Sequence, residues 1–318
     1  MAKESGTPSL KSTRVFGDYL LMLIVPAVMS IWYYGSAALF TLLTCVGTSI
    51  VADFIASMVI YRQYYIADFS APVTGAMIAL MMPASCPYYV EMLACLFAVL
   101  VIKIPFGGGM RAPFVPAAAG FASAAVCFKD LVFTYSGGRD YMNTASIAST
   151  LLSNGSMKLT TSTVLDILTG NFYGPMGTGC VIIFLGCIIF MLIRRKDSLL
   201  STAGFLAVVI VSALVFPRTS GTRISSLVLE LSSGSLLFAS VFLMTDYSTL
   251  PKHNINRVVY GAFTGILCMV MRHLGAYEEP VCFAILLGNA FSPVLDILTD
   301  YVLNLISSKR KKKEVNAN

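Results

Sequence analysis

Apolar residues occupy this chain in long blocks, and most of the polar residues are gathered in the short intervals between them. A helix needs about 20 mostly apolar residues to cross a bilayer core about 30 Å thick. The pattern therefore predicts an all-α integral membrane protein with about ten transmembrane helices, several of them tilted, broken or re-entrant because their blocks are short. The ten blocks cover residues 16–34, 37–60, 71–85, 90–105, 113–128, 178–193, 199–216, 231–247, 257–274 and 281–306.

The composition excludes an ordinary soluble enzyme. Of the 318 residues, 57% are hydrophobic and 12% are charged, whereas charged residues make up about 25% of a soluble domain. The basic run Lys309–Lys313 directly follows the last apolar block, so it is better placed to meet anionic lipid headgroups than a nucleic acid. We therefore expect the lipid bilayer as a partner and no nucleic acid.

The distribution of positive charge predicts the orientation of the chain. Cytoplasmic loops retain an excess of Lys and Arg. With ten spans and a cytoplasmic N-terminus, 16 of the 22 basic residues fall on the cytoplasmic side and 6 on the outer side. We therefore expect a multi-pass protein of the inner (cytoplasmic) membrane with both termini in the cytoplasm.

This topology, together with an internal similarity, divides the chain into five parts. The segment Gly108–Ala117 matches Gly275–Ala284 at an offset of 167 residues. Five spans per half is an odd number, so the halves would be inverted-topology repeats, the plan of membrane folds that build a midplane site from broken helices. Chance similarity between Gly- and Pro-containing apolar segments is the alternative. The predicted parts are a cytoplasmic tail at 1–15, a first membrane repeat at 16–128, an extracytoplasmic loop at 129–177, a second membrane repeat at 178–306 and a basic cytoplasmic tail at 307–318.

One hydroxyl-rich, glycine-punctuated stretch separates the two halves. Residues 159–179 read LTTSTVLDILTGNFYGPMGTG, with four consecutive hydroxyls at Thr160–Thr163. Such a segment lets a reactive side chain sit on backbone that bends closely around a bulky group. A serine- and threonine-rich turn that caps the next helix would produce the same pattern.

Ionisable residues inside apolar blocks are functional candidates, because a membrane makes them costly. Asp53 lies within the second block and Asp246 at the end of the eighth, and we take both as candidates for an ion pathway. Asp296 and Asp300 share a face of the last helix, where an interfacial position explains them as well. The run Gly107–Gly109 predicts non-helical backbone that lines a buried cavity, or a simple re-entrant loop.

The cysteines and histidines give little sign of a metal centre. None of the eight cysteines falls in a CxxC pattern, and most lie in apolar blocks. We expect them to be buried small hydrophobic residues. A single cysteine donated to a cluster shared between subunits stays open, and the two histidines do not favour haem ligation within this chain.

Several motifs together resemble the NqrB/RnfD family, whose RnfD members are D subunits of Rnf electron transport complexes. The resemblance covers nearly the whole chain. The segment Phe283–Asp296, which reads FAILLGNAFSPVLD, carries the most distinctive match. The other matching segments are Thr74–Pro83, Phe106–Gly108 with Pro113–Ala117, Gly170-Asn171 with Gly174 and Gly177, and Met244–Asp246 with Arg257, Gly261 and Arg272.

The resemblance implies a covalent flavin cofactor. In that family a flavin transferase joins FMN through its phosphate to a threonine hydroxyl outside the cytoplasm. With Gly170, Asn171 and Gly174 as the register, the attachment residue falls on Thr163, with Ser162 beside it. The resemblance also implies a further flavin site of the riboflavin type, for which Gly107 and Gly108 are candidates. The sequence Ser220–Arg223 is a rival attachment site that also faces outward.

Arginines of the predicted outer loops are candidates for the flavin phosphate, because guanidinium groups bind phosphate well. We name Arg139, Arg218 and Arg223, and simple solvation of these loop residues is the alternative.

The resemblance implies an electron-carrying subunit of a translocase. Such a complex couples electron transfer between ferredoxin and NAD⁺ to Na⁺ or H⁺ translocation, and its other subunits are of the Rnf A, B, C, E and G type. This chain would not be a complete enzyme alone, because the flavin supplies the redox chemistry and the protein supplies placement and electrostatics. The alternative is a secondary transporter or channel with an inverted-repeat fold and no redox cofactor.

Overall fold

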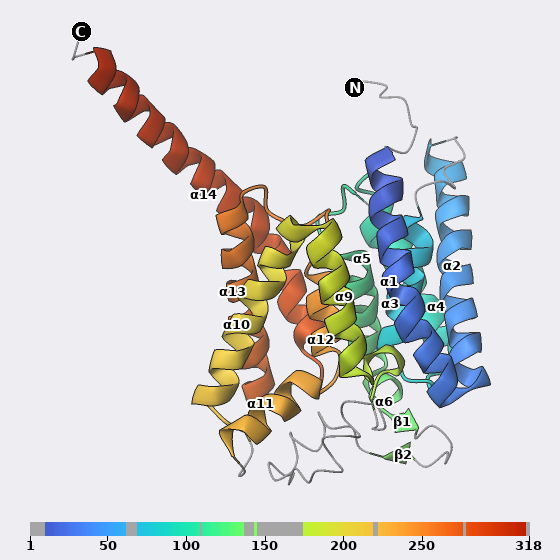
Figure 1. Ribbon diagram of the computed structural model, residues 1–318. Helices are drawn as coiled ribbons and strands as arrows, with labels where there is room; N and C mark the ends of the chain where they lie inside the picture. The colour runs from blue at the N-terminus through green and yellow to red at the C-terminus, as the bar shows by residue number, and fades with distance from the viewer. Residues whose placement is uncertain are drawn as a thin grey trace.

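A computed structural model describes residues 10–61, 69–108, 110–136, 143–144, 174–218, 222–275 and 278–315. The described helices pack side by side into one bundle (Figure 1). The start of α1 (Leu10–Tyr34) and the last turns of α14 (Val281–Val315) lie at one end of the bundle, which we call the terminal end. The short strands β1 (Tyr135–Ser136) and β2 (Asn143–Thr144) lie at the opposite end, the loop end.

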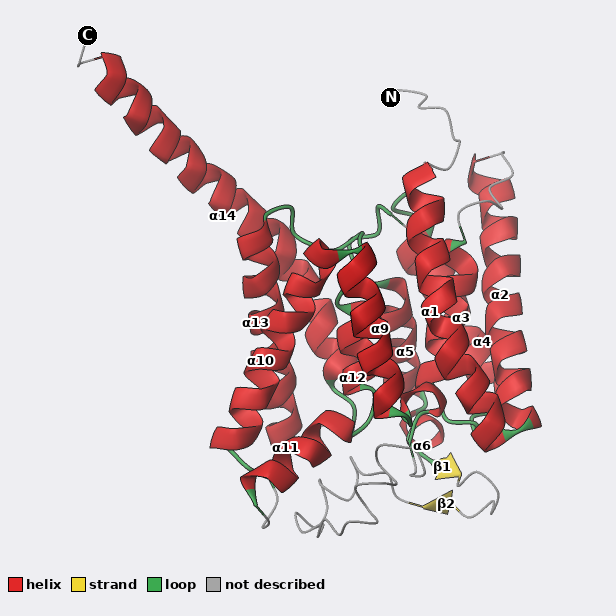
Figure 2. Ribbon diagram, in the orientation of Figure 1, coloured by secondary structure: helices red, strands yellow, loops and turns green. Residues whose placement is uncertain are grey.

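The first half of the chain forms α1 and the helical elements up to α5, which lie side by side between these two ends (Figure 2). Helix α1 joins α2 through Gly35, whose φ of 65° is a conformation that glycine adopts readily. A π-helical segment, η1, continues α4 without interruption. The elements after α1 are α2 (Ser36–Tyr61), α3 (Ser70–Met81), α4 (Tyr88–Leu96), η1 (Phe97–Lys103) and α5 (Pro116–Cys127).

The loop end carries only small elements between the two halves. Helix α6 (Lys129–Val132) leads into β1, which pairs antiparallel with β2 in the register Tyr135 to Thr144. A 3₁₀ turn, η2 (Met176–Thr178), then precedes the second half.

The second half again contains long and short helices. Helix α11 is followed after three residues by α12, and the two are sharply bent relative to each other. The elements are α9 (Val181–Arg194), η3 (Lys196–Ser198), α10 (Leu199–Val215), α11 (Arg223–Ser232), α12 (Leu236–Phe238), the π-helical η4 (Ala239–Leu243), α13 (Asn254–Leu274) and α14.

The structure confirms a helical membrane protein with several candidate spans, but not ten complete ones. Within the described ranges, five helices are long and apolar enough to cross a membrane, and the bent α11–α12/η4 pair makes a sixth if it counts as one span. The apolar helices α3, α5 and α9 have 12, 12 and 14 residues. At about 1.5 Å per residue, a 12-residue helix is too short to cross the hydrocarbon core. The count of ten spans stays a prediction.

The helices of the two halves begin at matching positions. Ser70 of α3 and Leu236 of α12 are 166 residues apart, and Tyr88 of α4 and Asn254 of α13 are also 166 apart. In both halves a left-handed residue precedes the short helix, Phe69 with φ of 53° and Gly234 with φ of 63°. This spacing is close to the sequence offset of 167 residues.

The helices α1 and α14 extend into the predicted tails, and two cysteines are not buried as expected. Helix α1 begins at Leu10, and α14 continues to Val315. Six of the eight cysteines are buried as expected, whereas Cys127 is exposed and Cys180 is partly exposed. Cys127 is the last residue of the short α5, next to the exposed Val126.

Small residues allow the closest helix contacts. A Cβ on Gly261 of α13 would lie 2.0 Å from the backbone oxygen of Ser201 on α10. Gly204 of α10 is equally close-packed, because its Cβ would lie 2.4 Å from the backbone oxygen of Val258. In contrast, Trp32 and Ile193 are 77% and 76% exposed and face outward, as lipid-contacting side chains do.

We expect Gly261→Ala to destabilise the protein by about 1–3 kcal/mol, because an added methyl in a filled contact forces the helices apart. The measurement is the thermal unfolding midpoint of the purified chain in detergent. Gly186→Ala is the matched control, since nothing lies within 4 Å of a Cβ there. Equal midpoints for the two variants would contradict the packing argument.

Candidate functional site

The loop end is built around a break in one helix. Helix α11 ends at Ser232, α12 begins at Leu236, and the two parts are bent by 69°. Gly234 stands in the break with φ of 63°, a left-handed conformation that other residues adopt only with strain. The flanking serines suit a turn, because their hydroxyls bond to nearby backbone groups. A break inside a membrane protein leaves backbone carbonyls that need new partners.

Arg272 of α13 supplies partners for those carbonyls. Its Nη1 donates to the backbone oxygen of Glu230 (3.0 Å) and to the hydroxyl of Ser233 (2.9 Å), and its Nη2 donates to the backbone oxygen of Ser233 (3.0 Å). Nη1 also lies 2.8 Å from Oε2 of Glu230, and both side chains are only 2% exposed. The guanidinium therefore holds the end of α11 against α13 with an ion pair shielded from water.

A second arginine completes this cluster. Arg218 pairs through Nε with Oε1 of Glu230, and its Nη1 donates to the backbone oxygen of Arg272 at 2.7 Å. We call Arg218, Glu230 and Arg272 the arginine clamp. One carboxylate between two guanidinium groups leaves the clamp with an excess of positive charge.

Glu279 reaches the break from the connection between α13 and α14. It is 1% exposed and accepts hydrogen bonds from the hydroxyls of Ser235 and, at 3.4 Å, Tyr135. A Cβ on Gly234 would lie 2.7 Å from the Glu279 carboxylate, so the close approach requires glycine. Burial raises the pKa of Glu279 from 4.5 to about 7, while the Ser235 hydrogen bond and the charge of Arg272 oppose that rise.

The end of the glycine-rich segment is fixed at the same end of the bundle. The N–H of Met176 donates to the backbone oxygen of Met82, just after α3, at 3.1 Å. The backbone oxygen of Met176 accepts from the hydroxyl of Ser30 (3.0 Å), and that of Gly174 accepts from the hydroxyl of Tyr34 (3.3 Å). Gly174 is therefore attached to α1 and, through Met176, to α3.

The other predicted flavin-binding residues of this segment, Thr163, Ser162, Gly170 and Asn171, lie outside the described residues, as do Arg139 and Ser220. Thr222 of the rival attachment site is described and caps α11. Its Oγ1 accepts from the N–H of Ser225 (3.3 Å) and lies 2.6 Å from the Ser225 hydroxyl. A helix cap therefore explains this hydroxyl without a cofactor.

The two described arginine candidates differ in availability. Arg218 belongs to the arginine clamp, so two of its three guanidinium nitrogens are already engaged. Arg223 is exposed at the first position of α11. The first turn of a helix presents unpaired backbone N–H groups and favours anions, so Arg223 is the better placed of the two for a phosphate.

The glycines predicted to line a second flavin site lie at the other end of the protein. Gly107 and Gly108 follow η1 with φ of 95° and 104°. This segment leads to Val115 and Pro116, which line a pocket with Phe16 near the start of α1. The structure therefore separates these glycines from the broken helix instead of bringing them together with it.

Asp53 forms an ion pair with a lysine that the sequence pattern did not place near it. Its carboxylate lies 2.9 Å from Nζ of Lys103, and the lysine side chain is 2% exposed. The charge count places Lys103 with the basic residues of the cytoplasmic side, but it is the last residue of η1 and is buried beside α2. Asp53 is thus half of a buried ion pair between α2 and η1.

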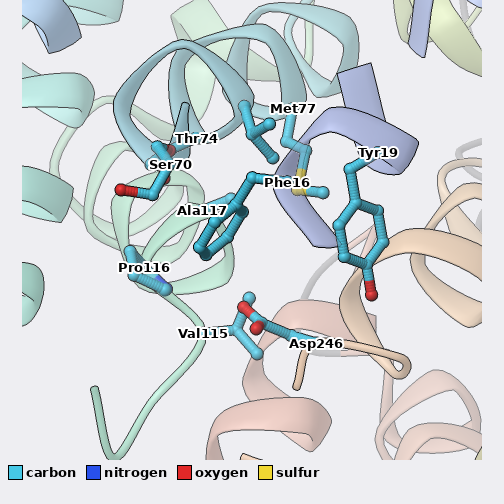
Figure 3. A pocket seen from close by; sticks show the side chains of 10 residues that line it. Phe16, Tyr19, Ser70, Thr74, Met77, Val115, Pro116, Ala117 and Asp246 are labelled. Carbon is cyan, nitrogen blue, oxygen red and sulfur yellow. The ribbon is translucent and has the colours of Figure 1, made fainter. Parts of the chain in front are cut away.

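Asp246 lines a narrow pocket near the terminal end (Figure 3). Its carboxylate points into the pocket below the ring of Phe16, while Tyr19 bonds through its hydroxyl to the backbone oxygen of Thr245 at 2.6 Å. The N–H and hydroxyl of Ser248 both donate to Oδ1 of Asp246 at 3.2 Å. Burial raises the pKa of Asp246, and the bonds from Ser248 oppose the rise. The turn hydrogen bonds explain part of its role without an ion.

The acids of the last helix behave as interfacial groups. Asp296 accepts from the N–H of Lys252 (3.0 Å) and from Asn256 (2.9 Å), and Asp300 lies 2.9 Å from His253. These contacts join α14 to the start of α13.

Besides Lys103, sequence reasoning missed four buried charged side chains: Glu91, Glu230, Glu279 and Arg272. Glu91 is the one that could have been found, because it stands alone at the start of an apolar block. The other three lie between helices whose mutual packing the pattern does not reveal.

A family model described as the NQR2, RnfD, RnfE family matches residues 7–302 of the chain. A similar relative is the D subunit of the ion-translocating oxidoreductase complex of Ectopseudomonas mendocina, 26% identical over 88% of each chain. The protein of the same name from Haemophilus influenzae strain PittEE is 26% identical over 94% of this chain and 96% of its own.

A third relative, from Clostridium ljungdahlii, is named as the D subunit of the proton-translocating ferredoxin:NAD(+) oxidoreductase complex. It is 25% identical over 91% of each chain. These matches extend across both halves of the bundle, including the broken helix and the segment around Asp246.

We expect Glu230→Ala to destabilise the protein by about 3–5 kcal/mol, because it leaves the buried guanidinium of Arg272 and the partly buried one of Arg218 without their carboxylate. The measurement is the thermal unfolding midpoint in detergent. Arg223→Ala is the control, since this exposed residue should change the stability by less than about 0.5 kcal/mol. A wild-type midpoint for Glu230→Ala would show that the clamp does not support the fold.

The raised pKa of Glu279, which lies outside the spanning helices, predicts a pH dependence of stability. Below pH 4.5 the carboxyl is protonated both folded and unfolded, so it contributes no pH dependence there. Between 4.5 and about 7 only the unfolded chain loses the proton, so stability falls by about 3 kcal/mol as pH rises through this window. Glu279→Gln mimics the protonated acid, so it should flatten that dependence. At pH values above neutral, its thermal unfolding midpoint should be higher than that of the wild type.

Asp197→Asn, a change of an exposed acid at the terminal end, serves as the control and should keep the wild-type pH profile. Identical pH profiles for Glu279→Gln and wild type would contradict the assignment.

Proposed function

Because the chain belongs to the NQR2, RnfD, RnfE family, we propose that it is the flavin-carrying membrane subunit of an ion-translocating oxidoreductase complex. The complex would transfer electrons between ferredoxin and NAD⁺ and couple this transfer to Na⁺ or H⁺ translocation. The name of the Clostridium ljungdahlii relative supports the ferredoxin and NAD⁺ part. The chain would be one subunit and not a complete enzyme.

The anchored end of the glycine-rich segment is the observation that carries this proposal. Gly174 and Met176 are bonded to α1 and to the end of α3. The attachment residue that we propose, Thr163, precedes this fixed point by eleven residues. A carrier needs its cofactor tethered close to a rigid frame, and the hydrogen bonds at Gly174 and Met176 provide that frame at the loop end.

The described residues at the loop end fit a flavin phosphate. Arg223 is exposed at the first turn of α11, where backbone N–H groups also favour an anion. The arginine clamp adds positive charge near the same helix. FMN joined to Thr163 by a phosphoester would supply one- and two-electron redox chemistry. This chain's residues would hold its phosphate and shield the adjoining backbone from water. A riboflavin-type second flavin stays a proposal without a described residue that supports it.

The matched helix starts support the inverted-repeat part of the proposal. The first half begins with α1 at the terminal end, whereas the second half begins with α9 near the loop end (Figure 1). The elements α3 and α12, α4 and α13, and α5 and α14 follow in the same order with nearly constant spacing. We propose ten membrane-inserted segments in two inverted repeats, several of them not crossing completely.

The exposed apolar faces support a membrane location and protein partners. Of the 18-residue apolar windows in the five long helices, only 33–44% of residues are buried, so the remainder faces lipid or other membrane subunits. We propose the Rnf A, B, C, E and G types as partners, with a flavin transferase for maturation. The basic last turns of α14 support a cytoplasmic terminal end in the inner membrane.

The proposal predicts that Thr163→Val abolishes covalent flavin. The chain is produced together with its flavin transferase, denatured, and examined for flavin fluorescence in the gel band and for the mass of FMN on the peptide holding residue 163. Thr161→Val, two positions away, is the matched control and should keep the flavin.

A wild-type chain without any flavin mass would sink the carrier proposal and favour a transporter without a redox group. A flavin found on Ser220 or Thr222 would leave the function intact and move the site.

A further inference from the structure

One buried carboxylate of the membrane region has no cation beside it. Glu91 of α4 is 0% exposed, and among the described residues no Lys, Arg or His forms an ion pair with it. The buried acids Asp53 and Glu230 differ, since Asp53 is paired with Lys103 and Glu230 with two arginines. Glu279, in the α13–α14 connection, forms no ion pair among the described residues, but the charge of Arg272 acts on it. A bare carboxylate in an apolar interior is costly, so such a group tends to bind a proton or a cation.

Two threonines of α2 form the contacts of Glu91. Thr41 lies 3.1 Å from Oε1, and Thr44 lies 3.1 Å from Oε2. The thiol of Cys45 is farther, 3.9 Å from Oε2. Along α2 these threonines lie five and eight residues after Ser36, which places them about 8 and 12 Å inside its loop-end terminus. Glu91 is therefore inside the bundle but nearer to the loop end.

The count of hydrogens at Thr44 decides the state of the carboxyl. A threonine hydroxyl has one hydrogen and two lone pairs. Thr44 Oγ1 lies 3.1 Å from Oε2 of Glu91 and 3.0 Å from the backbone oxygen of Thr41, and its one hydrogen can make a linear, full-strength bond to only one of these oxygens. If Oε2 carries a proton, Glu91 donates to Thr44, Thr44 donates to the Thr41 carbonyl, and the Thr41 hydroxyl donates to Oε1. Each contact then has its own hydrogen.

We propose that Glu91, held between Thr41 and Thr44, is a proton-binding site of the membrane region that is occupied at neutral pH. The titratable groups that face it are thiols, from Cys45 on α2, from Cys86 in the α3–α4 connection and from Cys95 one turn along α4. None of these provides a positive charge that would hold the proton-free form. Thr44 accepts the hydrogen bond from the protonated Glu91, so its hydroxyl is the first group to which the proton could be passed.

The site lies on the same pair of elements as the Asp53–Lys103 ion pair. Glu91 and Lys103 both face α2, from the start of α4 and from the end of η1. Between their levels α2 carries the hydroxyl of Ser49, which is buried and has no hydrogen-bond partner among the described residues. Participation of Glu91 in ion translocation rests on the proposed function, whereas its protonation does not.

Infrared difference spectra between wild type and Glu91→Gln test the proposal directly. At neutral pH the wild-type chain should show the carbonyl stretch of one protonated carboxylic acid that the variant lacks. Raising the pH should replace that band with a carboxylate band, the acid-to-carboxylate ratio falling about tenfold per pH unit past the midpoint. A carboxylate band lost at neutral pH instead would overturn the proposal and leave Glu91 as a structural acid favoured by the first turn of α4.

The contribution of Thr44 separates a proton relay from simple packing. Thr44→Val removes the acceptor of the Glu91 proton, so the acid band should shift, while Thr44→Ser keeps the hydroxyl and should keep the wild-type band. An unshifted band in Thr44→Val would contradict the hydrogen count. Measuring these variants by size-exclusion chromatography confirms that each is folded.

The same spectra distinguish a proton from a sodium ion. At constant neutral pH, NaCl and KCl should leave the acid band equally unchanged. Conversion of the acid band to a carboxylate band by NaCl and not by KCl would show that the site holds Na⁺ and would overturn the proton assignment. The flavin mass on residue 163 is measured separately, so loss of the flavin and loss of the acid band are independent results.

Discussion

The arginine clamp is the interaction on which the loop end depends. A helix that breaks inside a membrane protein exposes backbone carbonyls that water cannot reach. Arg272 donates to the carbonyls of Glu230 and Ser233, which the break of α11 leaves open. The ion pair with Glu230 compensates the positive charge of Arg272, which is buried in this position. Without the arginine, the turn at Gly234 would leave unsatisfied carbonyls in an apolar interior, so the broken helix and its charges stabilise each other.

At the end of the short helix α3, a backbone N–H and not a side chain supplies the hydrogen bond to a free carbonyl. Helix α3 stops at Met81, and the carbonyl of Met82 accepts the N–H of Met176. The segment that follows the proposed flavin attachment thus substitutes for the next turn of α3. In both halves a helix ends inside the protein and its last carbonyls need partners. A side chain, Arg272, supplies them in the second half and a backbone N–H, that of Met176, supplies one in the first half, and both contacts lie at the loop end. This common position would allow the loop end to hold the proposed cofactor, while the opposite end carries the basic last turns of α14.

Much of the fold could be predicted from apolar blocks alone, because each of the ten blocks overlaps a described helix. The blocks could not show where a helix stops within apolar sequence, as α3 does at Met81, so they could not separate complete spans from shorter segments. The clamp was missed because Arg272, near the end of the block 257–274, was counted with the basic residues of the outer side. Its burial depends on a partner, Glu230, on a different helix. Of the predicted cofactor residues, Gly174 lies at the loop end as expected, whereas Gly107 and Gly108 lie near the opposite end.

The buried acids Asp53 and Glu230, which have a cation beside them, differ from Glu91, which has none among the described residues, in how readily they can take up a proton. Asp53 and Glu230 have cations within 3 Å, and an acid in such a pair loses the partner's attraction if it takes up a proton. These acids stay ionised and keep helices together. Glu91 has hydroxyl partners that accept or donate equally well, so its two protonation states differ by a rearrangement of hydrogens and not by a broken ion pair. A group that must repeatedly gain and lose a charge in a membrane needs this second kind of surroundings, which is why we propose Glu91, and not Asp53 or Glu230, as the acid that carries a proton.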